Sequence, residues 1–344
     1  MAGDYVVVTG AGGFIGGHLI GDLLSRGHTR VRAVDCKAFD DWHQLHDGVD
    51  NIVADLRHRE CCNRVCAGAE AVYQLAADMG GMGFIETHKA ECMLSVLINT
   101  HMLLAAREHG VQRYFYASSA CVYNADKQIH TDVTALRETD AYPAQPEDGY
   151  GWEKLFSERM CRHFREDFGL ETRVARYHNI YGPHGTWQGG REKAPAAICR
   201  KVLEAKISGD HAISIWGNGE QTRSFTFIDD CLEGTHLILN GGESEPLNVG
   251  SSELVSINQL VGIVEEIAGI QLTRYYEPDA PIGVNGRNSD NTRIRQIFDW
   301  EPSVPLRTGL EKTYKWIHDQ YVKRYAGQLG PRAESPLGAH VRAR

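Results

Sequence analysis

A strand, a glycine-rich turn and a helix follow one another at residues 5–16, and this pattern constrains the fold more than any other feature of the sequence. The segment reads YVVVTGAGGFIG, with Gly10, Gly13 and Gly16 between an apolar run and a helical pattern. The first glycine permits a tight turn, the second lets the backbone approach a pyrophosphate, and the third allows close helix–strand packing. The helix N-terminus adds amide donors and a positive dipole. The spacing therefore predicts a dinucleotide-binding turn rather than a loop that merely changes direction.

Short apolar runs and longer amphipathic segments alternate through the first half of the chain. Strands are expected at 4–9, 31–35, 51–54, 70–75, 113–117 and 171–176. Helices are expected between them, at 14–26, 58–67, 87–109 and 149–168. Such alternation implies right-handed crossovers and parallel strands. The predicted fold class is α/β, a Rossmann-type doubly wound parallel sheet that binds its ligand at the carboxyl ends of the strands.

An acidic residue, Asp35, closes the second expected strand, 19 residues after Gly16. A carboxylate at this point binds the ribose hydroxyls of an adenine dinucleotide and repels a 2′-phosphate, which favours NAD over NADP. Lys37 lies close enough to keep NADP as a minor alternative. Asp55 and Leu56 end the third strand, where an adenine contact is expected. The expected cofactor-binding residues are Gly10, Gly13, Phe14, Ile15, Gly16, Asp35, Asp55, Leu56 and Lys154.

The alternating pattern loosens after residue 178, which we interpret as the start of a second lobe. Residues 1–178 are expected to form the NAD-binding Rossmann domain, and residues 179–324 a smaller mixed α/β substrate-binding lobe. The two are expected to interleave, because 223–250 has the pattern of a strand, helix and strand returning to the main sheet. Further helices are expected at 192–206, 256–268 and 307–324. The tail, 325–344, lacks periodicity and is expected to be disordered.

Composition excludes several functional classes. The 36 Lys and Arg residues against 45 Asp and Glu give a net charge of -9, so nucleic acid is not an expected partner. No apolar stretch approaches the ~20 residues of a membrane span, and no secretory leader is visible. Nine scattered cysteines, an odd number, indicate reduced thiols in the cytoplasm. They show no ligand spacing with histidines, so no metal site is expected.

Tyr150 and Lys154 stand four residues apart in GYGWEK, on one face of an expected helix. An ammonium beside a phenol, with the cationic nicotinamide near it, is expected to lower the phenol pKa, so that tyrosinate accepts a proton from a substrate hydroxyl while NAD takes the hydride. The Y-x-x-x-K spacing alone is common by chance. Its combination with the glycine turn and the strand order predicts an oxidoreductase-type site.

At this point the chain resembles the extended short-chain dehydrogenase/reductase family of nucleotide-sugar enzymes, over residues 4 to about 324. The motifs that carry the resemblance are TGAGGFIG at 9–16, LAA at 75–77, ASSACVY at 117–123, YGWEK at 150–154 and RYHNIYGP at 176–183. The resemblance implies that Ser119 assists Tyr150 at carbon 4 of the sugar. It also implies that Lys154 holds the nicotinamide ribose.

Cys121 and the segment GTWQGGREKAPAA at 185–197 indicate the branch of this family. Oxidation at carbon 4 of a pyranose makes the hydrogens on carbons 3 and 5 acidic, and a thiol whose pKa is drawn toward neutrality by a cationic lysine and NAD can remove them. With DMGGMGF at 78–84 and GRNSDN at 286–291, the chain resembles the GDP-mannose 3,5-epimerase branch. This resemblance implies Cys121 and Lys193 as the acid/base pair, and conversion of GDP-D-mannose to GDP-L-galactose, GDP-L-gulose or both.

The same resemblance implies a set of contacts to the GDP-sugar. They are Gly80, Ser119, Cys121, Asn179, Glu192, Lys193, Ala194, Lys201, Gln221, Thr222, Arg223 and Arg287. Two of these, Arg223 and Arg287, also suit a bidentate grip on a diphosphate. The family further implies a homodimer through the helices expected at 87–109 and 149–168.

Other interpretations remain open at this stage. Cys121 is alternatively a small buried hydrophobe and Lys193 a solvated lysine at a helix start. Another nucleotide-sugar conversion on the same scaffold, a 4-epimerase or a 4,6-dehydratase, is the main alternative function. The absence of an Asp-Glu pair at 120–121 argues against the dehydratase. A non-catalytic NAD-sensing module is a third, weaker alternative.

Overall fold

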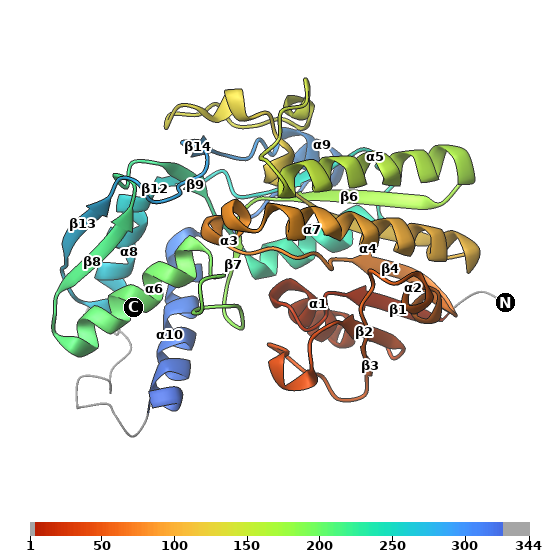
Figure 1. Ribbon diagram of the computed structural model, residues 1–344, viewed down its shortest axis with the longest axis horizontal. Coiled ribbons are helices and arrows are strands. Elements are labelled where there is room, and N and C mark those ends of the chain that lie inside the picture. Colours follow the sequence, from red (N-terminus) through yellow and green to blue (C-terminus); the bar gives the residue numbers. More distant parts are fainter. Residues whose placement is uncertain (1–3, 326–344) are drawn as a thin grey trace.

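A seven-stranded parallel sheet forms the centre of the computed structural model, which describes residues 4–325 (Figure 1). In spatial order its strands are β11 (Leu247–Val249), β6 (Glu171–Tyr177), β5 (Arg113–Ser119), β4 (Ala69–Gln74), β1 (Tyr5–Thr9), β2 (Val31–Asp35) and β3 (Asp50–Val53). Every neighbouring pair is parallel. The predicted α/β fold class, a Rossmann-type doubly wound sheet, is therefore confirmed.

Helices cover both faces of this sheet. On one face lie α1 (Phe14–Ser25) and α7 (Ile228–Asn240); on the other lie α2 (Arg59–Cys66), α4 (Lys89–Glu108) and α5 (Tyr150–Phe168). Consecutive residues of β1 serve the two cores: Val6 and Val8 pack in the core with α1, and Val7 packs in the core with α2 and α4. A strand buried on both faces needs a continuous apolar run, which explains the unbroken valines of the sequence.

The strand order reverses between β1 and β4, because the chain passes from β1 to β2 on one side and from β3 across to β4 on the other. Ligands of doubly wound sheets bind in the crevice at this reversal, outside the carboxyl ends of the strands. The Thr9 hydroxyl fixes the crevice, accepting hydrogen bonds from the amides of Leu75 (3.0 Å) and Ala76 (3.1 Å). The two loops that border the crevice are thereby joined.

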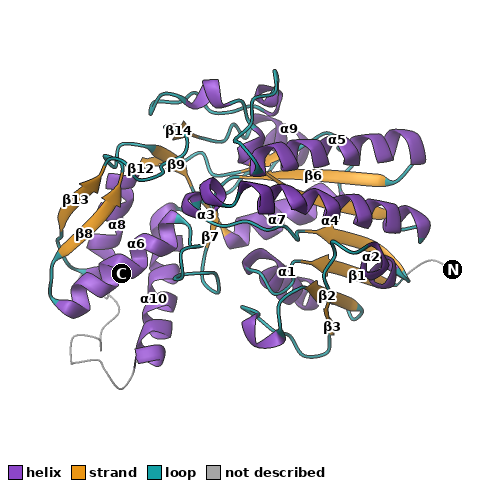
Figure 2. Cartoon of the chain, viewed as in Figure 1, coloured by secondary structure: helices purple, strands orange, loops and turns teal. Residues whose placement is uncertain are grey.

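The second half of the chain forms smaller sheets and helices at one end of the molecule (Figure 2). Its strands are β7 (Ile180–Tyr181) paired with β10 (Thr226–Phe227), β12 (Leu254–Ser256), β9 (Thr222–Ser224) and β14 (Gly286–Arg287) in one mixed sheet, and β13 (Thr273–Glu277) paired with β8 (Ala212–Trp216). The helices at this end are α6 (Ala194–Ser208), α8 (Ile257–Ala268) and α10 (Leu306–Tyr325), whereas α9 (Thr292–Phe298) packs against β11 of the main sheet. Short 3-10 helices occur at Phe39–Asp41, Ala120–Val122, Ala125–Gln128 and Glu138–Ala141.

The structure differs from the sequence-based expectation at several element boundaries. The helix expected at 87–109 is preceded by a separate helix, α3 (Met82–Thr87), and His88 between them has φ -125° and ψ 41°, outside the helical region. β8, β12, β13 and β14 are not predicted by the sequence, because strands of two to five residues carry little periodicity. The strand expected at the start of 223–250 corresponds to β9 and β10, which pair in the small sheets and not in the main sheet. β11 lies beside β6 in the main sheet. The division of the chain into lobes at residue 178 stays a prediction.

The predicted disordered tail begins inside α10, since residue 325 is helical, and its remainder, 326–344, lies outside the described residues. Among the helices within residues 4–325, none is both long and apolar enough to cross a bilayer.

Candidate active site

The turn between β1 and α1 has the geometry of a phosphate cradle. Gly10 has a φ of 68°, and a Cβ there would stand 3.0 Å from the backbone nitrogen of Ala76. A Cβ on Gly16 would stand 2.2 Å from the carbonyl oxygen of Gly10, so both positions require glycine. α1 begins after Gly13 with no side-chain cap and no acidic residue in its first turn, which leaves its first amides for an anion. The turn therefore fits the pyrophosphate of a dinucleotide.

Asp35 ends β2 beside this turn and is buried. One of its carboxylate oxygens accepts a hydrogen bond from the amide of Gly12 (3.0 Å) and the other from the amide of Lys37 (3.0 Å). The Lys37 ammonium in turn donates to the carbonyl of Gly12 (3.1 Å). Asp35 thus holds the turn in place, and its contact with the ribose hydroxyls stays a prediction. Phe14 and Ile15, at the start of α1, are half-buried.

The two residues expected near the adenine have different surroundings. The Asp55 carboxylate is paired with Arg57 (2.7 Å), whose hydrogen bonds lower the pKa of Asp55. Leu56 is buried in the core that α2 and α4 share, and its carbonyl accepts a hydrogen bond from the Cys62 thiol (3.1 Å). The Leu56 side chain is therefore committed to packing, and an adenine contact at these residues stays a prediction.

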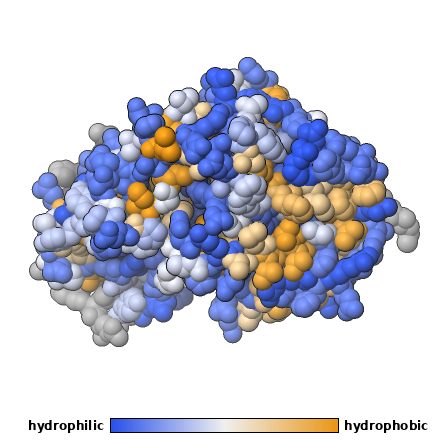
Figure 3. All heavy atoms as spheres, turned by 45° about the horizontal axis from the view of Figure 1, so that its top comes forward, coloured by the Kyte–Doolittle hydropathy of each residue, from blue (hydrophilic) through white to orange (hydrophobic). Residues whose placement is uncertain are grey.

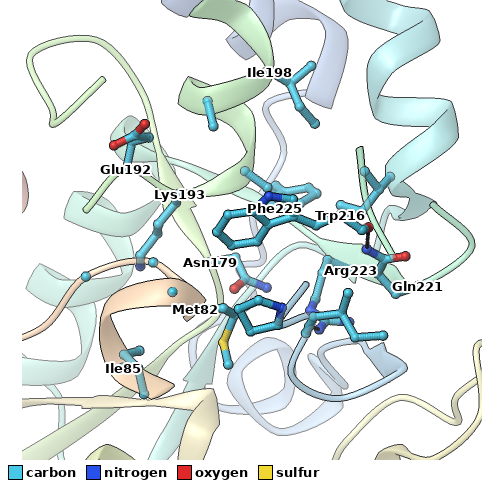
Figure 4. Close-up of a pocket in the computed structure, with 18 of the residues that line it drawn as sticks. Met82, Ile85, Asn179, Glu192, Lys193, Ile198, Trp216, Gln221, Arg223 and Phe225 are labelled. Atoms are coloured by element: carbon cyan, nitrogen blue, oxygen red, sulfur yellow. Dashed lines mark hydrogen bonds between the residues drawn. The ribbon is translucent and has the colours of Figure 1, made fainter. Parts of the chain in front are cut away.

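A cavity of about 300 Å³ opens at the carboxyl ends of β5 and β6, with α3, α6, β8 and β9 contributing to its walls (Figure 4). The sequence-predicted residues that line it are Gly80, Ser119, Cys121, Tyr150, Asn179, Glu192, Lys193, Ala194, Lys201, Gln221, Arg223 and Arg287. Thr222 is absent from this lining, and its hydroxyl donates to the carbonyl of Thr131 instead. Because β9 alternates its side chains, Arg223 and Thr222 face opposite ways.

Tyr150 and Lys154 occupy the first turns of α5, and both are buried. The Lys154 ammonium donates to the carbonyl of Ala117 (3.2 Å) and lies 3.7 Å from the Glu153 carboxylate. It stands 5.5 Å from the centre of the Tyr150 ring. Burial, followed by the charges of Cys121 and Glu153, raises the pKa of Tyr150 well above its ordinary value. The predicted lowering of this pKa includes the charge of the nicotinamide and stays a prediction.

Cys121 begins the loop after β5 and is 7% exposed. Its amide donates to the Ser119 hydroxyl (3.2 Å), and the Arg287 guanidinium donates to its sulfur (3.6 Å). Burial and the Glu147 charge raise the pKa of Cys121 to about 11, against the opposing effect of Arg287. Desolvation thus outweighs the arginine in setting this pKa, and the predicted thiol pKa near neutrality, which includes the charge of NAD, stays a prediction.

Lys193 is the N-cap of α6 and lies on the opposite wall, with its side chain reaching toward α3 (Figure 4). Burial lowers the pKa of the Lys193 ammonium, whereas the Cys121 charge acts to raise it. Within residues 4–325 no side chain forms an ion pair or a hydrogen bond with the Lys193 ammonium. The cavity thus holds a thiol and an amine whose protons are electrostatically coupled.

The two arginines have different partners. The Arg223 guanidinium donates to the carbonyls of Thr222 (2.7 Å), Ile282 (2.9 Å) and Val284 (2.6 Å). Burial, together with the charge of Arg287, lowers the pKa of Arg223 to about 10. Arg287 is 4% exposed and is paired with a carboxylate. Their joint grip on a diphosphate stays a prediction, and Arg287 lies at the Cys121 end of the cavity.

Four other expected contact residues also brace the cavity wall. Three donate to backbone carbonyls: Asn179 to Ser224 (2.9 Å), Lys201 to Ser214 (2.8 Å) and Gln221 to Trp216 (2.9 Å). The carboxylate of Glu192 accepts from the amide of Gly190 (2.7 Å) and from Arg200 (3.1 Å). Figure 4 shows Gln221 and Arg223 together on the side of the cavity away from Lys193.

Several site residues were missed by reasoning from the sequence. Trp216 and Pro281–Ile282 line the cavity, and Glu147 pairs with Arg287 at its edge. Trp216 lies at the end of a short strand with no motif around it. Glu147 stands three residues before Tyr150, so its place near the site could be inferred from the sequence. Its pairing with Arg287 could not, because the two residues are 140 positions apart.

Comparisons with known proteins agree with this geometry. The sequence profile of the NAD dependent epimerase/dehydratase family matches residues 6–250. GDP-mannose 3,5-epimerase 1 of Oryza sativa subsp. japonica is 47% identical over 325 residues, covering 92% of this chain and 82% of the relative. GDP-mannose 3,5-epimerase of Arabidopsis thaliana is 44% identical over 328 residues, covering 93% and 84%.

Among solved structures, UDP-glucose 4-epimerase of Thermotoga maritima superposes with a TM-score of 0.82 at 24% identity, covering 92% of this chain and 99% of that one. This likeness concerns the fold. With the profile match over residues 6–250 and relatives above 40% identity, this chain belongs to the NAD dependent epimerase/dehydratase family.

Proposed function

We propose that this chain epimerises GDP-D-mannose at carbons 3 and 5, giving GDP-L-galactose, GDP-L-gulose or both. The observation that carries the proposal is that one cavity holds Tyr150 together with two further proton-exchanging groups, Cys121 and Lys193. An epimerase that inverts only carbon 4 has no need of the second pair. The GDP-mannose 3,5-epimerases of two plants, at 44% and 47% identity, support the same substrate.

The cofactor is NAD, which when bound supplies the reversible oxidation at carbon 4 of the sugar. Gly10, Gly13 and Gly16 would cradle its pyrophosphate, and Asp35 would face its ribose. At the sugar, Tyr150 accepts the proton of the carbon-4 hydroxyl and later returns it. The Lys154 ammonium, fixed on the carbonyl of a buried strand, offsets the negative charge of the tyrosinate.

Inversion of a carbon next to a ketone requires one group to remove a proton and another to deliver a proton to the opposite face. Cys121 lies at the end of β5 and Lys193 at the start of α6, so the two groups come from different walls of the cavity. Burial favours the neutral form of each, a thiol and an amine. A thiol and an amine on different walls can act as the donor and the acceptor that inversion requires.

The α6 N-terminus and Arg223 support recognition of the diphosphate. α6 has no side-chain cap and no acidic residue in its first turn, so the amides of Ala194 and Ala196 can bind an anion, whereas Pro195 between them has no N–H. Arg223 is a buried cation that, within the described residues, is bonded to carbonyls only. A guanidinium in this setting gains a charged partner when a phosphate binds.

Incubation with GDP-mannose in heavy water tests the proposed function. Deuterium is expected at carbons 3 and 5, and the absence of label at both positions would refute the proposal. Cys121→Ala is expected to abolish exchange at one or both carbons while NAD still binds. Cys161→Ala is the matched control, because Cys161 is a buried thiol of α5 that does not line the cavity.

We also propose that the chain forms a homodimer through α4 and α5, which pack side by side. Exposed apolar residues lie on both helices, with Met93, Leu94 and Leu97 on α4 and Trp152 and Phe156 on α5. Figure 3 shows apolar side chains gathered over the right-hand half of the molecule. A surface of this kind on two adjacent helices suits a second copy of the same face, related by a two-fold axis.

A cytoplasmic location is proposed on the state of the thiols. All nine cysteines lie within the described residues, and all are free. Unpaired thiols are typical of a reducing compartment.

A further inference from the structure

Glu147 is a buried carboxylate that the mechanism above does not use. It lies in the loop before α5, three residues ahead of Tyr150, and its side chain is 10% exposed. Its amide donates to the carbonyl of Cys121 (3.0 Å), so this loop is bonded directly to the segment that carries the thiol. Burying a carboxylate is costly unless a partner compensates it, which raises the question of what this residue does.

Arg287 joins Glu147 to the thiol. One terminal nitrogen of its guanidinium donates to the Cys121 sulfur (3.6 Å), and the other donates to the Glu147 carboxylate. Its Nε donates to Gln128 (2.7 Å), so all three nitrogens of the fork are engaged. Because the guanidinium is planar and rigid, the sulfur and the carboxylate are held side by side.

The thiol and the carboxylate also interact with each other. Each alters the pKa of the other: the Glu147 charge raises the pKa of Cys121, and the thiol lowers the pKa of Glu147. The second carboxylate oxygen, Oε2, is buried and has no hydrogen-bond partner within residues 4–325. Burial acts to raise the pKa of Glu147, but Arg287 and the thiol outweigh it, so the carboxylate is ionised.

The other ionisable groups that act on the thiol come from different elements. Lys193 and Arg223 each interact electrostatically with Cys121, from the start of α6 and from β9. Tyr150 interacts with it from α5, and burial raises the pKa of that phenol. Against this cationic surrounding, Glu147 supplies the negative charge next to the sulfur.

We propose that Glu147 is a positioning residue for the epimerisation: it locks Arg287 against the Cys121 sulfur and cancels the charge of that arginine, so that Cys121 carries its proton at neutral pH. The role of Glu147 in epimerisation rests on the proposed function. The geometric claim concerns only the ionisation of one thiol, which can be measured without turnover.

Glu147→Gln reveals the effect of the charge. The amide is isosteric and its oxygen still accepts from Arg287, but the negative charge is lost and the arginine is no longer balanced. Both changes favour the thiolate, so the pH at which Cys121 ionises falls. A neighbouring charge shifts a pKa by about 1–3 units, so the thiolate fraction at a given pH rises by at least about tenfold.

A neighbouring carboxylate provides a matched control. Glu147 and Asp148 both line a second, smaller cavity of about 130 Å³, but Asp148 is exposed and pairs with Lys89 (3.0 Å). Asp148→Asn removes one negative charge from the same loop without touching the thiol or Arg287. It is expected to leave the ionisation of Cys121 unchanged.

The experiment is alkylation of the full-length protein by iodoacetamide across a pH series, with the rate at Cys121 followed by mass spectrometry of its peptide. Wild-type protein is expected to show an alkylation midpoint above about pH 10, Asp148→Asn the same midpoint, and Glu147→Gln a midpoint lower by about one unit or more. A wild-type midpoint at the ordinary value of about 8.5 overturns the proposal even if Glu147→Gln does not fold. An unshifted Glu147→Gln midpoint, or an equal shift in Asp148→Asn, also overturns it.

Failure of this inference is distinct from failure of the proposed function. The alkylation midpoint reports on Glu147 whether or not GDP-mannose is a substrate, whereas deuterium exchange in the wild-type protein reports on the substrate. A protein that exchanges deuterium but shows no effect of Glu147→Gln retains its function and loses only this role.

Discussion

Gly16→Ala is a sharp test of the phosphate-binding turn. The Cβ of an alanine at this position would stand 2.2 Å from the carbonyl oxygen of Gly10, 2.8 Å from the carbonyl carbon of Gly10 and 2.9 Å from the Cα of Ala11. All three are backbone atoms, so no side-chain rotation relieves the clash. An ordinary contact needs about 3.4 Å or more, and the turn must therefore retreat from α1 by about 1 Å.

The cost of this retreat sets the expected effect. Backbone shifts forced by overpacking cost about 1–3 kcal/mol. Because about 1.4 kcal/mol corresponds to a tenfold change in an equilibrium constant, NAD affinity is expected to fall by about 5- to 150-fold if the cost falls on the bound state. The displaced backbone is the part of the turn that would contact the pyrophosphate, which is why the loss appears in binding.

Isothermal titration of nucleotide-free protein with NAD measures this affinity. Gly262→Ala in α8 is the matched control, because its nearest atom outside its own helix is the end of the Arg274 side chain, at 3.7 Å. That substitution is expected to raise the free energy of unfolding by about 1 kcal/mol, since alanine is the better helix former, and to leave NAD affinity unchanged. A folded Gly16→Ala protein that binds NAD within about threefold of wild type would show that the turn is not the cofactor site.

Four further predictions concern the cofactor, stability, acid sensitivity and assembly. Asp35→Ser is expected to raise NADP affinity relative to NAD by about tenfold, measured by paired titrations, because a charge that repels the 2′-phosphate is removed. Glu158→Gln is expected to lower the free energy of unfolding in urea by about 3–5 kcal/mol, because Glu158 and Arg176 form a buried bidentate pair and the arginine loses its counterion. The pKa of buried His178 is lowered to about 3 by desolvation, so the unfolded state binds the proton more tightly and stability should fall as pH falls from about 6.5. His178→Phe is expected to flatten the loss of melting temperature over that range, and an unchanged slope would contradict the assignment. Phe156→Glu is expected to give monomers in sedimentation, by burying a charge in the proposed interface.

The sequence alone determined the features that depend on local spacing. The glycine turn at 9–16 predicts the first strand, the first helix and the dinucleotide site, because glycine positions report directly on backbone conformation and close approach. The Y-x-x-x-K spacing at Tyr150 and Lys154 places both groups on one helix face, since helical periodicity fixes that relation. Alternating patterns sufficed for the doubly wound sheet, because strands buried on both faces need continuous apolar runs.

The tertiary structure alone decided which charges meet at Cys121 and in which direction they act. Arg287 reaches the thiol from β14, a two-residue strand too short to leave a periodic pattern, and it brings Glu147 with it from a loop 140 residues earlier. The Cys121 thiol, the Tyr150 phenol and the Lys193 amine stand in motifs that also hold cations or possible bases. Their spacing in the sequence therefore suggests pKa values shifted toward neutrality. Their pKa values move instead toward the neutral forms, because burial removes water from each group, and desolvation is a property of the folded interior that no local sequence pattern records.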